Sequence, residues 1–478
     1  MSSIFDNNEN KEKCQIFTPQ LMVDTMLDLA GYTKNLMGRK VLENSFGKGN
    51  ILKSVVKRYI NSCIDENIPV ELISENLGND IYGIELDNQL FQKCMQELNS
   101  IAEDYKLPPV KWNLYNENAL TWETNQQFDL IIGNPPYITY KKIDVNSKKQ
   151  IRETFTSCSV GKFDYCYAFI EAGIRLLKKN GKLVQLIPSN IFKNVFANNL
   201  RNLLKEHISI ILDYPSQRIF EGILTSTSIF LYDQENHEQH ICYKNETEKT
   251  ELIIPKNQLN GKWMFSFSNE NAKKITTVRF GDVFNASIVI ATLLNKAFIV
   301  TKEKIDEKGI EESIIRKAVS PRSFRYNREE YIIFPYKYND SKLVRLNPDT
   351  FKDDFPGATC HLEEYIKELG ERKKDLNTQW FEYGRTQALA HLNQEKLLLS
   401  TVVTNQVELY ELDRDTIPYS GIYITIKEGS TYLLEDAKSI LKSSEFMEYV
   451  KKVGISVSGK SIRITCKDIN DFKFKGGR

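Results

Sequence analysis

Short apolar segments alternate with helical patterns over residues 14–235, and this alternation constrains the fold more than any other feature. Neighbouring parallel strands need a crossover connection, which is usually a helix. The alternation therefore predicts a largely parallel α/β sheet with helices on both faces. The expected strands are Lys40–Glu43, Ile81–Glu85, Phe128–Ile132, Lys182–Ile187, Ile208–Asp213 and Ser226–Tyr232. The expected helices are Leu21–Ala30, Ile51–Ile60, Gln89–Ile101, Phe163–Lys179 and Phe196–His207.

The pattern changes beyond residue 234. Glu235–Asn260 is polar and is interpreted as a linker, and Met264–Arg478 is interpreted as an α+β region. A chain of 478 residues suggests two or three domains. We expect one domain over residues 1–240 and a second over 241–478. The expected elements of the second are the strands Glu330–Phe334, Lys396–Val402 and Gly421–Ile426, and the helices Leu362–Leu376 and Leu434–Lys452.

The sequence Asp129-Leu-Ile-Ile-Gly-Asn-Pro-Pro-Tyr137 carries the strongest chemical signal. The prolines stiffen the backbone at the carboxyl end of a strand, where open α/β sheets bind ligands. The Asn134 side-chain oxygen and the Pro135 carbonyl can accept the two N–H bonds of a planar amino group such as that of adenine. This would free the nitrogen lone pair for attack. Tyr137 can stack on the base, and Pro136 completes the candidate catalytic set.

Val41-Leu-Glu-Asn-Ser-Phe-Gly-Lys-Gly49 places an acidic residue at a strand end and two glycines before a helix. Glycines allow close backbone approach, and a helix N-terminus favours a carboxylate. The Glu43 carboxylate can pair with a positive amino group. An ordinary Gly-x-Gly turn is an equally good interpretation of this segment alone.

Ile81-Tyr-Gly-Ile-Glu-Leu-Asp87 places Glu85 at the end of the second strand, the usual position for an acid that holds ribose hydroxyls. Asp87 is suited to cap the following helix. In isolation, this capping role explains the segment equally well. The order of the three segments favours a nucleotide-like cofactor over three unrelated turns.

Residues from about Gln15 to Tyr232 resemble the gamma-class (TaqI-type) adenine-N6 DNA methyltransferases of type II restriction–modification systems. Phe17-Thr-Pro19, Asn118-Ala-Leu-Thr-Trp122 and Gly161-Lys-Phe-Asp164 match further motifs of this family. The resemblance implies a Rossmann-like class I methyltransferase domain with a mostly parallel seven-stranded sheet, followed by an α+β target-recognition domain. It implies S-adenosylmethionine as the cofactor. The residues implied to bind it are Phe17, Thr18, Pro19, Glu43, Asn44, Ser45, Gly47, Gly49, Glu85, Leu86, Asn118, Ala119, Asn134 and Phe163.

The resemblance also implies double-stranded DNA as the partner and a flipped-out adenine as the target. Ile219-Phe220 resembles the loop that presents an aromatic ring, so the base would lie between Tyr137 and Phe220. Trp380-Phe-Glu-Tyr-Gly-Arg385 resembles part of the specificity domain. DNA contacts are also expected from Arg322, Arg325 and Arg328, which are interleaved with Tyr326, and from the basic run Arg372–Lys374. A basic cluster of this kind is more often a solvated face.

Two positions depart from the family pattern. Asn44 stands where the family often has proline, and Asn118 stands where an aspartate commonly accepts a hydrogen bond from the cofactor adenine. An amide oxygen also accepts, so we expect weakened rather than abolished binding. Neither position belongs to the catalytic motif.

Composition sets the remaining expectations. The eight cysteines are scattered without a Cys-x-x-Cys pair, and the cluster of His237, His240 and Cys242 is not followed by a second ligand pair, so no metal is expected. The net charge of +1 neither supports nor excludes nucleic-acid binding. No apolar run approaches the roughly 20 residues that span a bilayer. We expect a monomeric protein of the bacterial cytoplasm, with no membrane partner and any cognate endonuclease on a separate chain.

Two other functions fit parts of the sequence. Enzymes that methylate RNA or a protein glutamine also use Asn-Pro-Pro-Tyr, because their targets offer a planar amino group. Such enzymes seldom carry more than 200 residues after the catalytic domain. A binding subunit without activity of its own is disfavoured by the intact motif at Asn134–Tyr137.

Overall fold

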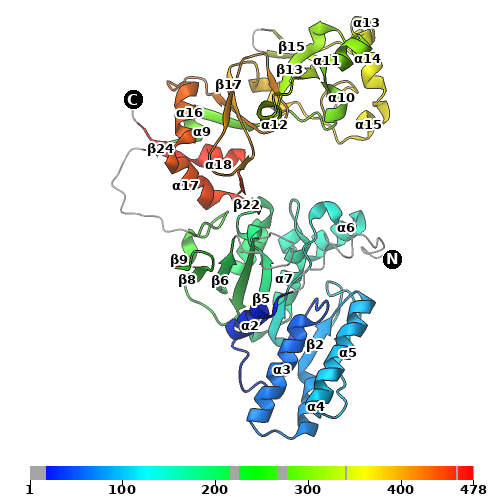
Figure 1. The fold of residues 1–478 in the computed structure, drawn as a ribbon, viewed down its shortest axis with the longest axis vertical. Coiled ribbons are helices and arrows are strands. Elements are labelled where there is room, and N and C mark those ends of the chain that lie inside the picture. Colours follow the sequence, from blue (N-terminus) through cyan, green and yellow to red (C-terminus); the bar gives the residue numbers. More distant parts are fainter. Residues whose placement is uncertain (1–17, 216–225, 266–276, 340–341, 459–460, 477–478) are drawn as a thin grey trace. The chain divides into compact units, whose positions relative to one another are not determined.

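The protein is described here from a computed structural model, shown in Figure 1, which describes residues 18–215, 226–265, 277–339, 342–458 and 461–476. The chain forms two compact units. The first comprises Met1–Ser268 with Ile455–Gly459, and the second comprises Asn269–Gly454 with Lys460–Arg478. The first unit extends beyond residue 240, so the predicted boundary falls too early by almost 30 residues.

A nine-stranded sheet forms the centre of the first unit, in the order β3-β2-β1-β4-β5-β7-β6-β8-β9. β7 is antiparallel to β5 and β6, and β9 is antiparallel to β8; the other neighbours are parallel. The predicted α/β class is confirmed, with two strands added to the expected seven. The strands are β1 (Val41–Glu43), β2 (Ile81–Ile84), β3 (Asn113–Tyr115), β4 (Phe128–Gly133), β5 (Leu177–Pro188), β6 (Ile208–Tyr214), β7 (Thr227–Asp233), β8 (His240–Asn245) and β9 (Thr250–Pro255).

Helices cover both faces of this sheet because the buried side chains of its central strands alternate in direction. Leu130 and Ile132 of β4 face one core, whereas Ile131 faces the other. The first core is covered by α2 (Gln20–Leu29), α3 (Asn50–Asp65), α4 (Val70–Asp80) and α5 (Asn88–Asp104). The second is covered by α6 (Val145–Thr154), α7 (Tyr165–Arg175) and α8 (Asn198–Lys205).

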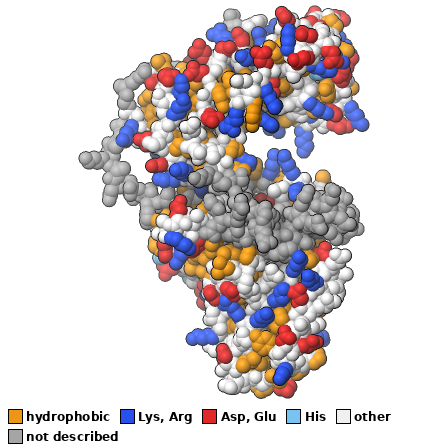
Figure 2. All heavy atoms as spheres, viewed as in Figure 1, with side chains coloured by type: hydrophobic (Ala, Val, Ile, Leu, Met, Phe, Trp, Pro, Cys, Tyr) orange, Lys and Arg blue, Asp and Glu red, His pale blue; other side chains and the backbone are white. Residues whose placement is uncertain are grey.

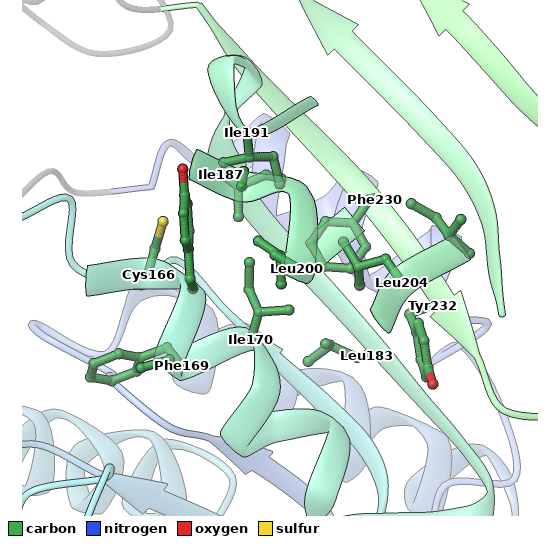
Figure 3. Close-up of a cluster of buried hydrophobic side chains, with 14 of the residues drawn as sticks. Cys166, Phe169, Ile170, Leu183, Ile187, Ile191, Leu200, Leu204, Phe230 and Tyr232 are labelled. Atoms are coloured by element: carbon green, nitrogen blue, oxygen red, sulfur yellow. The ribbon is translucent and has the colours of Figure 1, made fainter. Parts of the chain in front are cut away.

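The second core fixes the helix that forms one wall of the candidate site. Figure 3 shows Cys166, Phe169 and Ile170 of α7 among side chains of β5, β7 and α8. Cys166 and Ile170 are completely buried. At about 25 cal/mol per Å² of apolar surface, burying one such isoleucine contributes roughly 2 kcal/mol. The position of α7 is therefore set by packing along its whole length.

Two predicted features of the first unit need correction. Residues 235–260 are not a linker, because β8 and β9 pair as a hairpin that extends the sheet beyond β6. The predicted helix Phe163–Lys179 ends at Arg175, and β5 begins at Leu177. The pairing of β4 with β5 shifts register between Phe128 and Leu130, so β5 accommodates the polar residues 178–181 without losing its place in the sheet.

The second unit is an α+β unit built of small sheets. The sheet β11-β21-β17-β19 is antiparallel throughout, whereas in the sheet β12-β14-β13-β20 the last strand, β20, is parallel to β13. The pairs β10–β24, β15–β16 and β18–β23 are antiparallel. Its strands are β10 (Thr277–Arg279), β11 (Phe284–Ile288), β12 (Ile299–Val300), β13 (Ile315–Val319), β14 (Glu330–Ile333), β15 (Tyr336–Asn339), β16 (Lys342–Arg345), β17 (Lys396–Leu399), β18 (Val402–Val403), β19 (Leu409–Leu412), β20 (Ile417–Pro418), β21 (Ile422–Ile426), β23 (Ser461–Arg463) and β24 (Lys473–Lys475). A further strand, β22 (Ile455–Ser458), falls within the segment grouped with the first unit.

The helices of the second unit are short. They are α9 (Phe280–Val283), α10 (Asn295–Phe298), α11 (Lys302–Lys308), α12 (Pro321–Arg325), α13 (Phe351–Asp354), α14 (Pro356–Glu363), α15 (Ile366–Glu371), α16 (Leu434–Lys442), α17 (Ser444–Val453) and α18 (Cys466–Asp471). Two expected helices are each divided. Leu362–Leu376 is interrupted between α14 and α15, and Leu434–Lys452 is broken at Ser443, whose side chain accepts a hydrogen bond from the Phe446 amide and so starts α17.

Candidate active site

One pocket in the first unit lies at the carboxyl ends of β1, β2 and β4, the edge where open α/β sheets bind ligands. Thirteen residues predicted from the sequence line it: Thr18, Glu43, Asn44, Ser45, Gly47, Glu85, Leu86, Asn118, Ala119, Asn134, Pro135, Pro136 and Tyr137. Parallel strands bring these segments together because each motif follows the end of its own strand. The structure thus unites the candidate catalytic residues with most of the candidate cofactor residues.

Asn134 directly follows β4, and its side chain is held by a residue from the start of the described chain. Its Nδ2 donates a hydrogen bond of 3.2 Å to Thr18 Oγ1. The Ser45 hydroxyl contacts the Asn134 carbonyl at 3.5 Å. The amide nitrogen is thus directed to Thr18, and the side-chain oxygen is the acceptor end of this amide. Thr18 is therefore a positioning residue for this amide.

Tyr137 is held by its hydroxyl. The hydroxyl donates a hydrogen bond of 3.0 Å to the Leu186 carbonyl on β5, and burial raises the pKa of this phenol well above its usual range. The hydroxyl is therefore neutral and anchored, and the ring contributes a flat apolar surface to the pocket.

Glu43 is a buried acid at the end of β1. Its side chain is 2% exposed, and burial, together with the nearby Glu85, raises the pKa of the carboxyl well above its usual range. Its Oε2 forms no hydrogen bond with any described residue. A buried carboxyl oxygen left in this state is costly. A ligand that presents an ammonium group to Glu43 would satisfy it, which fits the amino-acid end of S-adenosylmethionine.

Glu85 organises the loops around the pocket as well as lining it. Its two carboxylate oxygens accept hydrogen bonds of 2.8 Å from the amides of Gly47 and Asp87. Burial raises the pKa of Glu85, and these two donors oppose the rise. Each oxygen keeps acceptor capacity for a ribose hydroxyl. Asp87 also caps α5, since it accepts from the amides of Gln89 and Leu90; the two interpretations of this segment are compatible.

Asn118 lines the pocket in a local turn. Its Oδ1 accepts a hydrogen bond of 3.0 Å from the Leu120 amide. The oxygen expected to accept from the cofactor adenine is thus already engaged by the backbone. This adds to the expectation of weaker adenine contact than an aspartate would give.

Three predicted cofactor residues do not line the pocket. Pro19 precedes the first turn of α2, and the Phe163 ring is fully buried against Tyr140 at 5.3 Å. Gly49 has a φ of 74°, and a Cβ there would lie 2.3 Å from Cys94 Sγ, so glycine is required for packing at the start of α3. Phe17 and Phe220 lie outside the described residues.

The sequence interpretation missed several lining residues. Tyr165 and Phe169 lie one turn apart on α7 and line the pocket in place of Phe163. Their spacing of four residues was the available signal, because it puts both rings on one helix face. Others are Phe46, Lys48, Asn50, Ile51, Ile84, Asp87, Asn88, Leu90 and Glu117.

The arginines predicted to contact DNA lie in the second unit and fall into two groups. Arg322 and Arg325 line a hollow beside α12, whereas Arg328 and Arg385 are exposed but do not line it. Arg372, from the second predicted basic cluster, is a structural residue. Its guanidinium donates hydrogen bonds to the carbonyls of Thr292, Trp380 and Glu382, and it is therefore withdrawn from solvent-facing contacts.

Figure 2 shows acidic and basic side chains interspersed over the visible faces of both units, in line with the net charge of +1. Within the described ranges, no group of three or more His, Cys, Asp or Glu side chains could hold a metal ion. No described helix combines the length and apolarity needed to cross a membrane.

Comparison with known proteins relates the chain to methyltransferases of restriction–modification systems. Residues 8–220 match the family model of the Eco57I restriction-modification methylase. The type II methyltransferase M.BstVI of Geobacillus stearothermophilus is 25% identical over 94% of this chain and 87% of its own length. The type II methyltransferase M.HincII of Haemophilus influenzae is 25% identical over 96% of this chain and 88% of its own length.

Solved structures share the fold at lower identity. The type IIL restriction-modification enzyme MmeI, determined in complex with DNA, has 13% identity and a TM-score of 0.64 over 94% of this chain. This chain corresponds to 63% of the length of the MmeI chain. The DrdV chain, determined as a DNA complex, has a TM-score of 0.52, 11% identity and 86% coverage of this chain. These two similarities extend over both units.

Proposed function

We propose that this chain, a methyltransferase of the type II restriction–modification class, transfers a methyl group to the N6 amino nitrogen of adenine in double-stranded DNA. The observation that carries the proposal is the Asn134 amide, held by Thr18 at the end of β4 within a pocket that also contains Glu43 and Glu85. Relatives called type II methyltransferases match both units, which supports DNA as the substrate. The proposed role is protection of DNA in a restriction–modification system, with any cognate endonuclease carried on another chain.

The pocket fits S-adenosylmethionine. Glu43 would hold the amino group, Glu85 the ribose hydroxyls, and the segment Asn118-Ala119 the adenine ring. When bound, this cofactor supplies an electrophilic methyl group on a sulfonium centre. The remaining contributions are made by the protein, which binds, orients and encloses the two reactants.

Asn134 and Pro135 would prepare the target amino group. The Asn134 side-chain oxygen and the Pro135 carbonyl accept its two N–H bonds, which shifts the nitrogen from a planar towards a tetrahedral geometry. The lone pair is then available for attack. Thr18 keeps the Asn134 oxygen in the acceptor position because it occupies the amide nitrogen. Preorganised acceptors of this kind act without reorganisation during the reaction.

Tyr137 would hold the base. Its hydroxyl is tied to β5, so its ring is a fixed stacking surface. An adenine inside a duplex cannot reach this ring, and the nucleotide must be rotated out of the stack at a cost of a few kcal/mol. The second unit would supply DNA contacts that offset this cost, and Arg322, Arg325, Arg328 and Arg385 are the candidate cations.

The test is expression in a host that lacks adenine methylation, followed by single-molecule mapping of modified bases. Methyladenine at one short recurring sequence is the expected result, and Asn134→Ala should abolish it. Asn76→Ala, the same change on α4 away from the pocket, serves as the control and should leave the pattern unchanged. Unmodified DNA from a folded, cofactor-binding protein would contradict the proposal and direct attention to RNA or a protein glutamine.

A further inference from the structure

A second hollow lies wholly within the second unit, between α12 and the loop that joins β18 to β19. Its volume is about 870 Å³, and its lining is rich in polar groups. Arg322, Arg325 and Tyr326 form one side, and Thr404, Asn405 and Gln406 belong to the other. The arginines were expected from the sequence, but the polar loop was not. The fold brings these segments together from positions about 80 residues apart.

The loop presents its three polar residues because buried residues hold it on each side. Val403 and Val407 are each 4% exposed, whereas Thr404, Asn405 and Gln406 between them are exposed. β18 pairs with β23, and the hydroxyls of Thr404 and Ser461 lie 3.1 Å apart. The loop is thus held at both ends by the buried side chains of Val403 and Val407, and at its first end also by the pairing of β18 with β23.

α12 is joined to the same loop by a charged contact and by ring stacking. Arg325 forms an ion pair of 3.2 Å with Glu408, which also accepts a hydrogen bond from the Tyr410 hydroxyl. The Phe324 and Tyr410 rings stack at 4.5 Å with an angle of 9°. Glu408 is therefore neutralised by Arg325. These contacts fix the spacing of the two sides of the hollow.

Several donors and acceptors in the hollow are not used by the protein itself. Across the described part of the chain, no hydrogen bond reaches the side chains of Asn405 or Gln406, and Arg322 forms no ion pair there. Gln406 also lines an adjoining hollow whose wall includes Lys442. Tyr326 is 59% exposed, and its ring lies within 6.0 Å of the Arg322 guanidinium. The two hollows thus combine side-chain amides with the cations Arg322 and Lys442, a set of groups suited to binding a polyanion that also offers hydrogen-bonding groups.

Given the proposed function, we infer that Asn405 and Gln406 determine the recognised DNA sequence by reading base edges, with Arg322 and Lys442 contacting phosphates beside them. A carboxamide carries an acceptor oxygen and a donor amino group, and one of each matches N6 and N7 of adenine in the major groove. Cations on phosphates fix the register of the protein on the duplex, and base contacts carry the sequence information. The same hollow thus provides both kinds of contact.

The test compares the recognised sequences of wild-type protein, Gln406→Glu and Asn405→Asp. A carboxylate only accepts, so it favours cytosine N4 over adenine. We expect one position of the recognised sequence to change preference by about tenfold or more, while S-adenosylmethionine binding stays the same. Gln258→Glu, an equal charge change at an exposed residue of the first unit, is the control and should leave the sequence unchanged.

The outcomes separate this inference from the proposed function. If wild-type protein methylates no DNA, the proposed function fails. If wild-type protein methylates a defined sequence and both variants methylate that sequence with unaltered base preference, the assignment of Asn405 and Gln406 is overturned. A lower overall rate with the same preference at every position also counts against base reading, because it indicates a structural or phosphate-binding role. Thermal unfolding of each variant shows whether the second unit remains folded.

Discussion

Asp164→Asn should change the pH dependence of folding of the first unit. Asp164 precedes α7, and its backbone forms a bridge with Thr139, two residues beyond the catalytic motif. Burial raises the pKa of this carboxyl to about 6, although the Tyr165 amide opposes the rise. Its Oδ1 forms no hydrogen bond with any described residue. The native state therefore favours the protonated acid.

The expected magnitude follows from this pKa. A rise from the usual value of about 3.9 to about 6 corresponds to roughly 3 kcal/mol. Because the folded pKa is raised, this acid stabilises the native state fully only below its unfolded pKa, and the stabilisation is lost as pH rises through about 6. Integrated between pH 5 and pH 8, the loss is about 1.4 kcal/mol. Asparagine does not ionise, so the free energy of unfolding of the variant should not fall in this way between pH 5 and pH 8.

The assay is urea unfolding at several pH values, followed by tryptophan fluorescence. Three of the four tryptophans lie in the first unit, and Trp380→Phe removes the signal of the second. In that background, the stability of Asp164→Asn relative to the parent should rise by about 1.4 kcal/mol from pH 5 to pH 8. Asp104→Asn, at the exposed end of α5, is the control. Parallel stability curves for parent and Asp164→Asn would refute the reasoning.

Three further changes have distinct expected results. Thr18→Val removes the hydrogen bond that orients Asn134 and should lower kcat about tenfold in single-turnover assays, which corresponds to about 1.4 kcal/mol of transition-state stabilisation. An unchanged kcat would exclude the positioning role of Thr18. Glu43→Gln replaces a buried acid, so it should stabilise the cofactor-free protein, as measured by thermal unfolding. It should also weaken S-adenosylmethionine binding at least tenfold, as measured by calorimetry. Unchanged affinity would exclude Glu43 from the cofactor site. Arg372→Met removes the guanidinium hydrogen bonds to the carbonyls of Thr292, Leu369, Trp380 and Glu382 and should destabilise the second unit by about 3 kcal/mol. Lys373→Met should have little effect in the same unfolding assay, and equal effects would contradict the structural role of Arg372.

The strands next to the site could be predicted because each is a short apolar run with a motif directly after it. Phe128–Ile132 is such a run, and β4 extends it by one residue to Gly133. β3 gave no comparable signal, since its three residues are only partly buried. β8 and β9, at one end of the sheet, were interpreted as a linker because the segment that contains them is polar. They are strands because they pair within the sheet, and their own sequences do not reveal this pairing.

The candidate site was predictable where it consists of contiguous motifs. Glu43 ends β1, Glu85 and Asn134 directly follow β2 and β4, and parallel pairing brings all three to one edge. The contact between Thr18 and Asn134 spans 116 residues, so no local pattern reveals it. Tyr165 and Phe169 were missed because helix α7 begins two residues after Phe163, which rotates the predicted aromatic ring into the core.

In the second unit, charge alone did not separate binding residues from structural ones. Arg322 and Arg372 are both arginines beside aromatic residues, yet the first lines an open hollow and the second bonds to backbone carbonyls. This difference depends on tertiary packing around a single guanidinium. Asn405 and Gln406 were not singled out either, because a polar loop residue is common and only the fold places these two beside α12.

The most direct measurement is mass spectrometry of nucleosides from duplex DNA treated with purified protein and S-adenosylmethionine labelled in its methyl group. We expect the label in N6-methyladenine, and its loss in Asn134→Ala protein that still binds the cofactor. Label in another nucleoside, or equal labelling by the variant, would contradict the assignment of Asn134 to the methylation of adenine.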